Sequence, residues 1–421
     1  MPDLSEKTRS KAFVTRIREM GWRDASYLEH NLLRVLIDDI GSFTPELCAV
    51  QEKRQINAHW IPHFRANSPK AFSDAENGAY WKSEHLYHSA GSFPCFPNFG
   101  SGHIADGITH PVNGWTANAR WNFVKKGKDE ESGAVWVLST LEAPENTMPL
   151  LFRKVDALIP GEPVHYSALR ISNTGTEDLE LCGGWQNIVG APFLSCGCRL
   201  SASAKEWVVP PLGSEFDATA RLAAGKEFIS LSKAPLAAGG ETDISVVSGP
   251  IGWTDFAMGA IPKSSTLGWT AVVNPFLKMV YAAFFPGPLL ADENNDIPIY
   301  FNDIFMQYGG RPWTPWAPYE GGTDLSYCLG MSGATAAWTS GLEFSRAERK
   351  VLGSPVTFTL PAKTEKTLCW GTLFAPYEDN ILDGGVVGMD GEDGILICKS
   401  AAAAWRFKAD ITFKVIRRLC Q

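Results

Sequence analysis

Short runs of β-branched and aromatic residues, separated by turn residues, recur along most of this chain. Apolar and polar side chains that alternate over about six residues are typical of a strand with one buried face. Long stretches of helical periodicity are absent. The pattern predicts strands at residues 33–38, 134–141, 151–159, 164–172, 179–183, 394–398 and 405–415. We therefore expect an all-β protein.

Two turn signals predict hairpins, and one segment predicts a helix. Asn173-Thr174-Gly175 would join the strand at 164–172 to the strand that follows it, because Asn and Gly favour tight reversals. The sequence PAKTEK would likewise join residues 356–360 to 367–374. Residues 5–20 show a short helical period, with Ser5 as a candidate cap, which predicts a helical N-terminal extension over residues 1–25.

Many strands without long helices predict stacked antiparallel sheets in a large β-sandwich. The pattern by itself leaves a jelly roll, a double sandwich and a propeller open. A propeller requires a blade period of roughly 40–50 residues, and the sequence has none. It also has no low-complexity tract and no linker-like stretch. We therefore expect one large domain over residues 1–421.

Composition narrows the classes of protein. Aromatic residues make up 11% of the chain, with 15 Trp, 39 Gly and 27 Pro, which suits short strands joined by tight turns. A formal net charge of −8 without a basic patch argues against non-specific nucleic-acid binding. The N-terminus has no apolar core, and no run reaches about 18 apolar residues. We expect no secretory signal, no membrane partner and a cytoplasmic location.

Motifs for cofactors and metals give no signal. The chain has no G-x-G-x-x-G run and no phosphate-binding Walker A loop, so no cofactor is expected. Its nine cysteines are spread along the sequence, and the pair Cys196-Gly-Cys198 has no matching second pair. Reduced thiols and no metal site are the expectation.

Residues 91–121 carry the strongest sign of a binding site. Aromatic rings, Pro-Asn turns and short polar groups alternate there, and a sugar-sized cleft needs flat apolar faces beside a few polar groups. Asn98, His103 and Trp115 are candidate ligand contacts. His110 is either an acid/base group or a loop histidine bonded to the backbone.

Other candidate contacts lie outside this segment. Arg65 could clamp a ligand hydroxyl or carboxylate, or form a surface ion pair. Asn302 and Asp303 are neighbours on an expected strand, so only one of them can face a cleft, and Asn302 is the predicted contact. Trp313 and Trp316 would stack on a ligand or pack beneath a Pro-rich loop.

Three segments, in this order, resemble the aldose 1-epimerase (galactose mutarotase-like) family. They are FPNFG with HPVNGWTANARW inside residues 93–121, LRISNTGTEDLELCGGWQNIVGAPFL at 169–194, and IYFNDIFMQYGGRPWTPWAPYEGGTDLSYCLGMS at 299–332. The resemblance implies a β-supersandwich with a sugar cleft on the concave face of one sheet. It also makes Trp185 in the second segment a candidate ligand contact.

The same resemblance implies that the family's catalytic groups have been replaced. Asn113 stands at the position of the first histidine, Gln186 at that of the second, and Ser332 at that of the glutamate base. A mutarotase moves protons with an acid and a base, whereas an amide does not exchange protons near neutral pH. We therefore expect Asn113, Gln186 and Ser332 to line the cleft, with His110 as a possible relocated acid/base group.

Three functions fit these observations, each with a small molecule as the partner. The first is a carbohydrate-handling isomerase with a diverged acid/base set. The second is a repurposed scaffold that acts as a lyase, isomerase or cyclase on a non-sugar metabolite, such as a polycyclic one, in a biosynthetic pathway. The third is a sugar-binding protein without catalytic activity.

Overall fold

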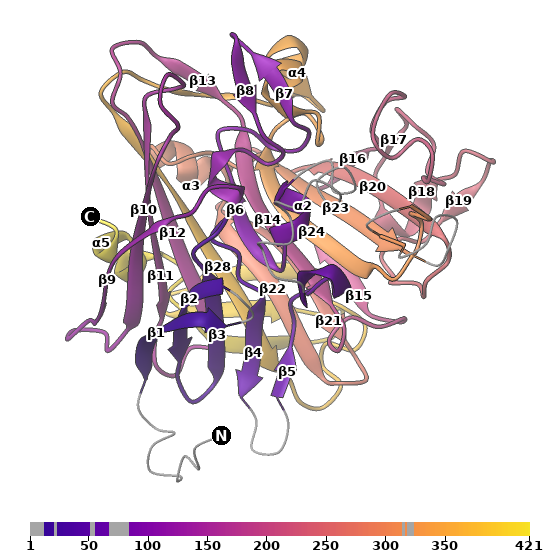
Figure 1. Cartoon of the computed structure of the whole chain (residues 1–421). Coiled ribbons are helices and arrows are strands. Elements are labelled where there is room, and N and C mark those ends of the chain that lie inside the picture. The colour runs from indigo at the N-terminus through magenta and orange to yellow at the C-terminus, as the bar shows by residue number, and fades with distance from the viewer. Residues whose placement is uncertain (1–11, 21–22, 51–54, 67–83, 314–315, 318–323) are drawn as a thin grey trace.

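The computed structural model describes residues 12–20, 23–50, 55–66, 84–313, 316–317 and 324–421 (Figure 1). Three antiparallel sheets dominate it. The first is a meander in which each strand pairs with the next along the chain. Its strands are β1 (Phe13–Met20), β2 (Arg23–Glu29), β3 (Leu33–Asp38), β4 (Glu46–Val50) and β5 (Gln55–Asn57).

The second sheet has eight strands, in the order β15-β21-β22-β28-β12-β11-β10-β9. Their bounds are β9 (Asn122–Lys128), β10 (Val135–Glu142), β11 (Leu150–Leu158), β12 (Val164–Asn173), β15 (Arg199–Ala202), β21 (Leu267–Asn274), β22 (Met279–Pro286) and β28 (Glu365–Pro376). Both faces of its central strands are buried, which explains why β22 reads as a continuous apolar run.

The third sheet has seven strands, in the order β17-β16-β20-β23-β24-β14-β6. They are β6 (Ser92–Cys95), β14 (Gly183–Gly190), β16 (Glu206–Val208), β17 (Glu227–Phe228), β20 (Trp253–Ala260), β23 (Phe301–Tyr308) and β24 (Tyr327–Thr335). Isolated bridges from Thr44 to Ser92 and from His59 to Val189 connect its edge to the first sheet. The two sheets together cover one face of the eight-stranded sheet.

The core between these layers is built on stacked aromatic rings. Trp185 on β14 stacks on Trp370 of β28 at 5.8 Å between ring centroids, and Phe285 on β22 stacks on Trp370 at 4.5 Å. Successive side chains of a strand point to opposite faces. Gln186, next to Trp185, therefore faces away from the core.

Smaller elements cover the remaining surfaces. On its other face the eight-stranded sheet packs against β29–β31 and α5, through residues such as Phe284, Leu396 and Phe407. These and the other small strands are β7 (His103–Ala105), β8 (Ile108–His110), β13 (Leu179–Leu181), β18 (Ala234–Pro235), β19 (Glu241–Thr242), β25 (Lys350–Val351), β26 (Ser354–Pro355), β27 (Phe358–Leu360), β29 (Gly388–Glu392), β30 (Ile395–Lys399) and β31 (Ala404–Lys408). The helices are η1 (His63–Ala66), α2 (Glu84–His88), η3 (Trp115–Ala117), η4 (Leu231–Lys233), α3 (Pro288–Glu293), α4 (Gly341–Glu348) and α5 (Lys414–Leu419).

The all-β class and the large antiparallel sandwich are confirmed, but the predicted N-terminal helix is wrong where the structure describes it. Residues Phe13–Met20 form β1 and pair with β2, and residues 1–11 lie outside the described residues. Cross-strand pairing outweighs the weak helical period of such a short segment. The expectation of one domain stays a prediction.

Both predicted hairpins are wrong, for one shared reason. β12 pairs with β28, and β13 pairs with β27. The segments 164–181 and 358–376 therefore run antiparallel to each other as one interrupted ribbon, and the turn at Asn173 is a kink that does not reverse the chain. A turn signal specifies local geometry, whereas the partner of a strand depends on the whole sheet.

Candidate functional site

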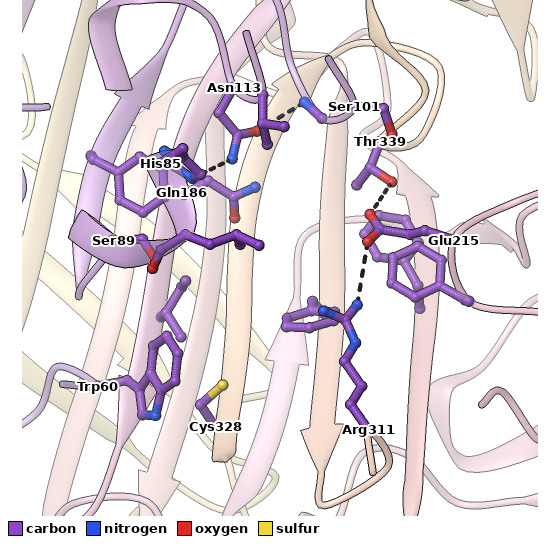
Figure 2. A pocket seen from close by; sticks show the side chains of 18 of the residues that line it. Trp60, His85, Ser89, Ser101, Asn113, Gln186, Glu215, Arg311, Cys328 and Thr339 are labelled. Atoms are coloured by element: carbon purple, nitrogen blue, oxygen red, sulfur yellow. Dashed lines mark hydrogen bonds and ion pairs between the residues drawn. The ribbon is translucent and has the colours of Figure 1, made fainter. Parts of the chain in front are cut away.

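A cavity of about 210 Å³ lies on the face of the seven-stranded sheet that points away from the core. Two groups of polar side chains face each other across it (Figure 2). Aromatic and aliphatic side chains make up most of the rest. The lining residues are Trp60, His85, Leu86, Ser89, Phe93, Gly100, Ser101, Val112, Asn113, Gln186, Ile188, Glu215, Phe216, Phe256, Phe305, Arg311, Trp316, Cys328 and Thr339.

Asn113 is held rigidly on one side of the cavity. It has φ 59, a left-handed conformation that Asn tolerates better than most residues. Its Oδ1 accepts a hydrogen bond from the Gly100 amide at 2.9 Å. Its Nδ2 lies 3.0 Å from His85 Nε2. The amide orientation is thereby fixed, with the nitrogen on His85.

His85, on α2, is a neutral imidazole that the sequence analysis did not identify. Its Nδ1 lies 3.2 Å from the Ala117 carbonyl oxygen, so Nδ1 carries the proton and Nε2 accepts from Asn113. Burial lowers the pKa of His85 to about 4, although the bond to Ala117 opposes this. Near neutral pH, His85 is therefore a hydrogen-bond acceptor that positions Asn113.

Gln186 and Ser332 lie next to each other on β14 and β24. The Ser332 hydroxyl donates to Gln186 Oε1, and Ser332 is buried with 3% of its surface exposed. Because the amide oxygen is occupied by Ser332, the Gln186 nitrogen is the group directed toward the cavity (Figure 2).

Arg311 and Glu215 form the opposite wall. Arg311 Nη2 lies 3.3 Å from Glu215 Oε2, and the Thr339 hydroxyl donates to Glu215 Oε1 at 3.1 Å. The guanidinium lies over the rings of Trp316, at 4.9 Å from the centroid, and Phe305, at 5.4 Å. Arg311 is buried, whereas the Glu215 side chain is 45% exposed. Glu215 is the only carboxylate among the described lining residues.

Trp316 belongs to this cavity, and its ring stacks on Trp60 at 6.4 Å and 24°. Trp313, on the same loop, is 39% exposed and does not line the cavity. The pair Trp60 and Trp316 offers the flat apolar surface on which a ligand ring could stack.

The predicted contacts around β7 and β8 form a separate stack. His103 lies 5.1 Å from His110, and His110 lies 5.5 Å from Trp115, with the rings nearly parallel. His110 is 1% exposed, and none of the three lines the cavity. Burial lowers the pKa of His110 to about 4, with a smaller contribution from His103.

The four remaining predicted contacts have structural partners. Asn98 is buried and accepts from the Leu342 amide at 2.9 Å, while Arg65 on η1 forms a buried ion pair with Asp38. Asn302 is buried and accepts from Ser203 Oγ at 2.9 Å. Trp185 is in the core described above. None of these lines the cavity.

Glu215, Arg311 and His85 line the cavity but are not among the site residues predicted from the sequence. Glu215 lies in a loop after β16, and Arg311 follows the end of β23. Neither has a local pattern that distinguishes it from a surface charge. In the described part of the chain, no group of three His, Cys, Asp or Glu residues could hold a metal ion. There, too, no helix has the length and apolar character to cross a membrane.

The architecture matches solved structures of galactose mutarotase-like proteins. No protein-family model matches the sequence, and neither does any curated protein. Of the solved structures, 73 chains match. A galactose mutarotase-like protein from Clostridium acetobutylicum is 11% identical with a TM-score of 0.57, over 87% of this chain and 99% of that one. A candidate aldose 1-epimerase from Klebsiella pneumoniae is 11% identical with a TM-score of 0.56, over 86% and 87%.

A galactose mutarotase-related enzyme from Lactobacillus acidophilus is also similar, at 11% identity and a TM-score of 0.51, over 84% of this chain and 98% of that one. At such identities the likeness concerns the fold. The chain has the galactose mutarotase-like β-sandwich fold that the three sequence segments predict.

Proposed function

We propose that this protein is a carbohydrate-handling isomerase of the aldose 1-epimerase type whose acid/base set has diverged. The observation that carries the proposal is the cavity wall opposite the amides, where Glu215 and Arg311 form an ion pair beside the stacked rings of Trp60 and Trp316. A carboxylate, a cation, amides and a flat aromatic face are the groups that recognise a sugar ring.

The carboxylate can replace the lost base. Glu215 would take the proton of the anomeric hydroxyl while the bond between the anomeric carbon and the ring oxygen opens. Gln186, and Asn113 through the N–H that is not bonded to His85, would donate hydrogen bonds to the ring oxygen, where negative charge develops. A water molecule would protonate this oxygen, and the hydroxide that remains would take the proton back when the ring closes. Ring closure on either face of the resulting aldehyde reverses these steps and exchanges the anomers. Ser332 would act by holding Gln186.

Anomer exchange is the direct test. We expect the protein to accelerate interconversion of the α and β forms of at least one of glucose, galactose and their 6-phosphates. Exchange NMR measures the rate above buffer alone. If no acceleration is seen with any of these aldoses, the isomerase proposal is wrong, and the two other functions remain for the same cavity.

Trp316→Ala should weaken sugar binding about 10-fold, or about 1.4 kcal/mol, since it removes one ring of the stacked pair. Isothermal calorimetry with the aldose that exchanges fastest measures the affinity. Trp313→Ala is the matched control, because Trp313 belongs to the same loop but does not line the cavity. Equal effects of the two substitutions would place the ligand elsewhere.

One observation favours the repurposed scaffold as a second candidate. Phenylalanines and aliphatic residues line much of the cavity, among them Phe93, Ile188, Phe216, Phe256 and Phe305. Such a surface suits a less polar metabolite than a free sugar. Three results together would support this candidate. The protein should bind the apolar probe anilinonaphthalene sulfonate, Trp316→Ala should abolish that binding, and no anomer exchange should be seen.

A further inference from the structure

A carboxyl group lies buried behind the cavity floor, at Asp303 on β23. Along this strand, Ile304 and Met306 pack in the core between the sheets, whereas Phe305 lines the cavity. Because strand side chains alternate between faces, Asp303 lies on the same face as Phe305. Asn302 points to the opposite face, where Ser203 occupies it.

The pairing of the strands places Asp303 beside Ser332. Asp303 is directly opposite Ser332 on β24 and Met258 on β20. Directly opposite residues of antiparallel strands have Cβ atoms about 4.5–5.5 Å apart. An Asp carboxyl group can therefore reach a Ser hydroxyl there by a rotation of its side chain. Ser332 in turn donates to Gln186, so a continuous polar row leads from Asp303 to the cavity.

Among the residues that the structure describes, Asp303 has no counter-ion for a negative charge. It is 1% exposed, and neither carboxyl oxygen has a hydrogen-bond partner among the described residues. Its strand neighbours Met258 and Ser332 carry no charge. Burial alone raises the pKa of Asp303 well above the usual value. The titratable groups that line the nearby cavity are His85, Glu215, Arg311 and Cys328, and neither carboxyl oxygen of Asp303 is hydrogen-bonded to any of them.

We propose that Asp303 is a protonated carboxylic acid that donates a hydrogen bond to Ser332 and so fixes the Gln186 amide with its nitrogen toward the ligand. The Ser332 hydroxyl donates a hydrogen bond to Gln186 Oε1. Its oxygen still has lone pairs, which can accept a hydrogen bond from Asp303. In a buried chain of this kind each bond strengthens the next. Asp303 is thus a positioning residue. Its benefit to a ligand rests on the proposed function, whereas its protonation does not.

Difference infrared spectroscopy tests the protonation. The wild-type spectrum minus that of Asp303→Asn should show the carbonyl stretch of a protonated carboxylic acid near neutral pH. Asp255→Asn is the matched control, since Asp255 is equally buried but paired with Arg221 at 2.6 Å, and this variant should lose only carboxylate bands. A carboxylate band at the Asp303 position would overturn the proposal.

Side-chain amide NMR tests the coupling to Gln186 without any ligand. The chain has five glutamines, so ¹⁵N-glutamine labelling gives few signals, and the one lost in Gln186→Ala identifies Gln186. Asp303→Leu and Ser332→Ala should both shift that signal, whereas Asp303→Asn, which can still donate to Ser332, should largely restore it. An unchanged signal in Asp303→Leu would overturn the proposal, even if Ser332→Ala shifts the signal through the direct bond from Ser332 to Gln186.

The signal of Gln307, which donates to Asp324 at 2.7 Å, reports on folding in the same spectra. If it moves in Asp303→Leu, that variant is misfolded, and the smaller Asp303→Ala, which also removes the donor to Ser332, decides. Since both measurements are made on the free protein, a failure to exchange any aldose leaves their outcome intact.

Discussion

Lys154→Met should lower the free energy of unfolding by about 3–5 kcal/mol, because it leaves a buried carboxylate without its cation. The Lys154 side chain is 0% exposed, and its ammonium lies 2.8 Å from both carboxyl oxygens of Asp156 and 2.9 Å from Ser42 Oγ. Urea unfolding measures the loss. Lys399→Met is the control, because its partner Asp390 is on the surface, where a pair contributes roughly 0–1 kcal/mol.

The dependence of stability on pH should also differ between the wild type and Lys154→Met. Burial by itself would raise the pKa of Asp156, but Lys154 and His165 hold it well below its usual value. A carboxylate with a depressed pKa in the folded state stabilises the protein above the unfolded pKa of 3.8. That stability is lost as the pH falls below this value. The wild type should therefore lose stability on acidification more steeply than Lys154→Met does.

Substituting both Lys154 and Asp156 shows how much of the lost stability comes from leaving the carboxylate unpaired. Burial lowers the pKa of Lys154 even beside Asp156, so the ammonium is solvated less well than in water. Lys154→Met combined with Asp156→Leu removes both charges and should regain most of the lost stability. If the single variant unfolds within about 1 kcal/mol of the wild type, the interior is more hydrated there than the structure indicates.

The sequence predicts the central strands well because their signals are local. Alternation and flanking turns locate β3 at the predicted residues, and β10–β12 within a residue or two. Strand partners are not local, which is why the turn signals at Asn173 and 361–366 predict hairpins that the structure does not form. β12 pairs with β28 across about two hundred residues of sequence, and β13 pairs with β27 across somewhat fewer.

The candidate site was predictable only where a segment could be recognised. The structure brings Asn113, Gln186 and Trp316 to one cavity, from segments that resemble a known family. Glu215 comes from a loop outside these segments, whereas Arg311 lies inside the third one at a position that the resemblance does not single out. Their significance arises from proximity across the cavity, which depends on the whole sheet.

Glu215→Gln should lower the rate of anomer exchange by about 10²–10⁴-fold, since it removes the proposed base while keeping the side chain's shape. Its amide oxygen can still accept from Thr339, so the affinity for the sugar should change little. Exchange NMR over a range of sugar concentrations separates kcat, which should fall, from KM, which should not. Glu206→Gln, at an exposed position on β16, is the control and should exchange anomers at the wild-type rate.

A Glu215→Gln variant that keeps the wild-type kcat would exclude Glu215 as the base. The loss expected here is a loss of proton transfer, because both side chains fill the same space beside Arg311 and Thr339. A rise in KM with an unchanged kcat would instead indicate that Glu215 contributes uniform binding to ground state and transition state. Its carboxylate would then recognise sugar hydroxyls, and the base would have to be sought among other groups that reach the cavity.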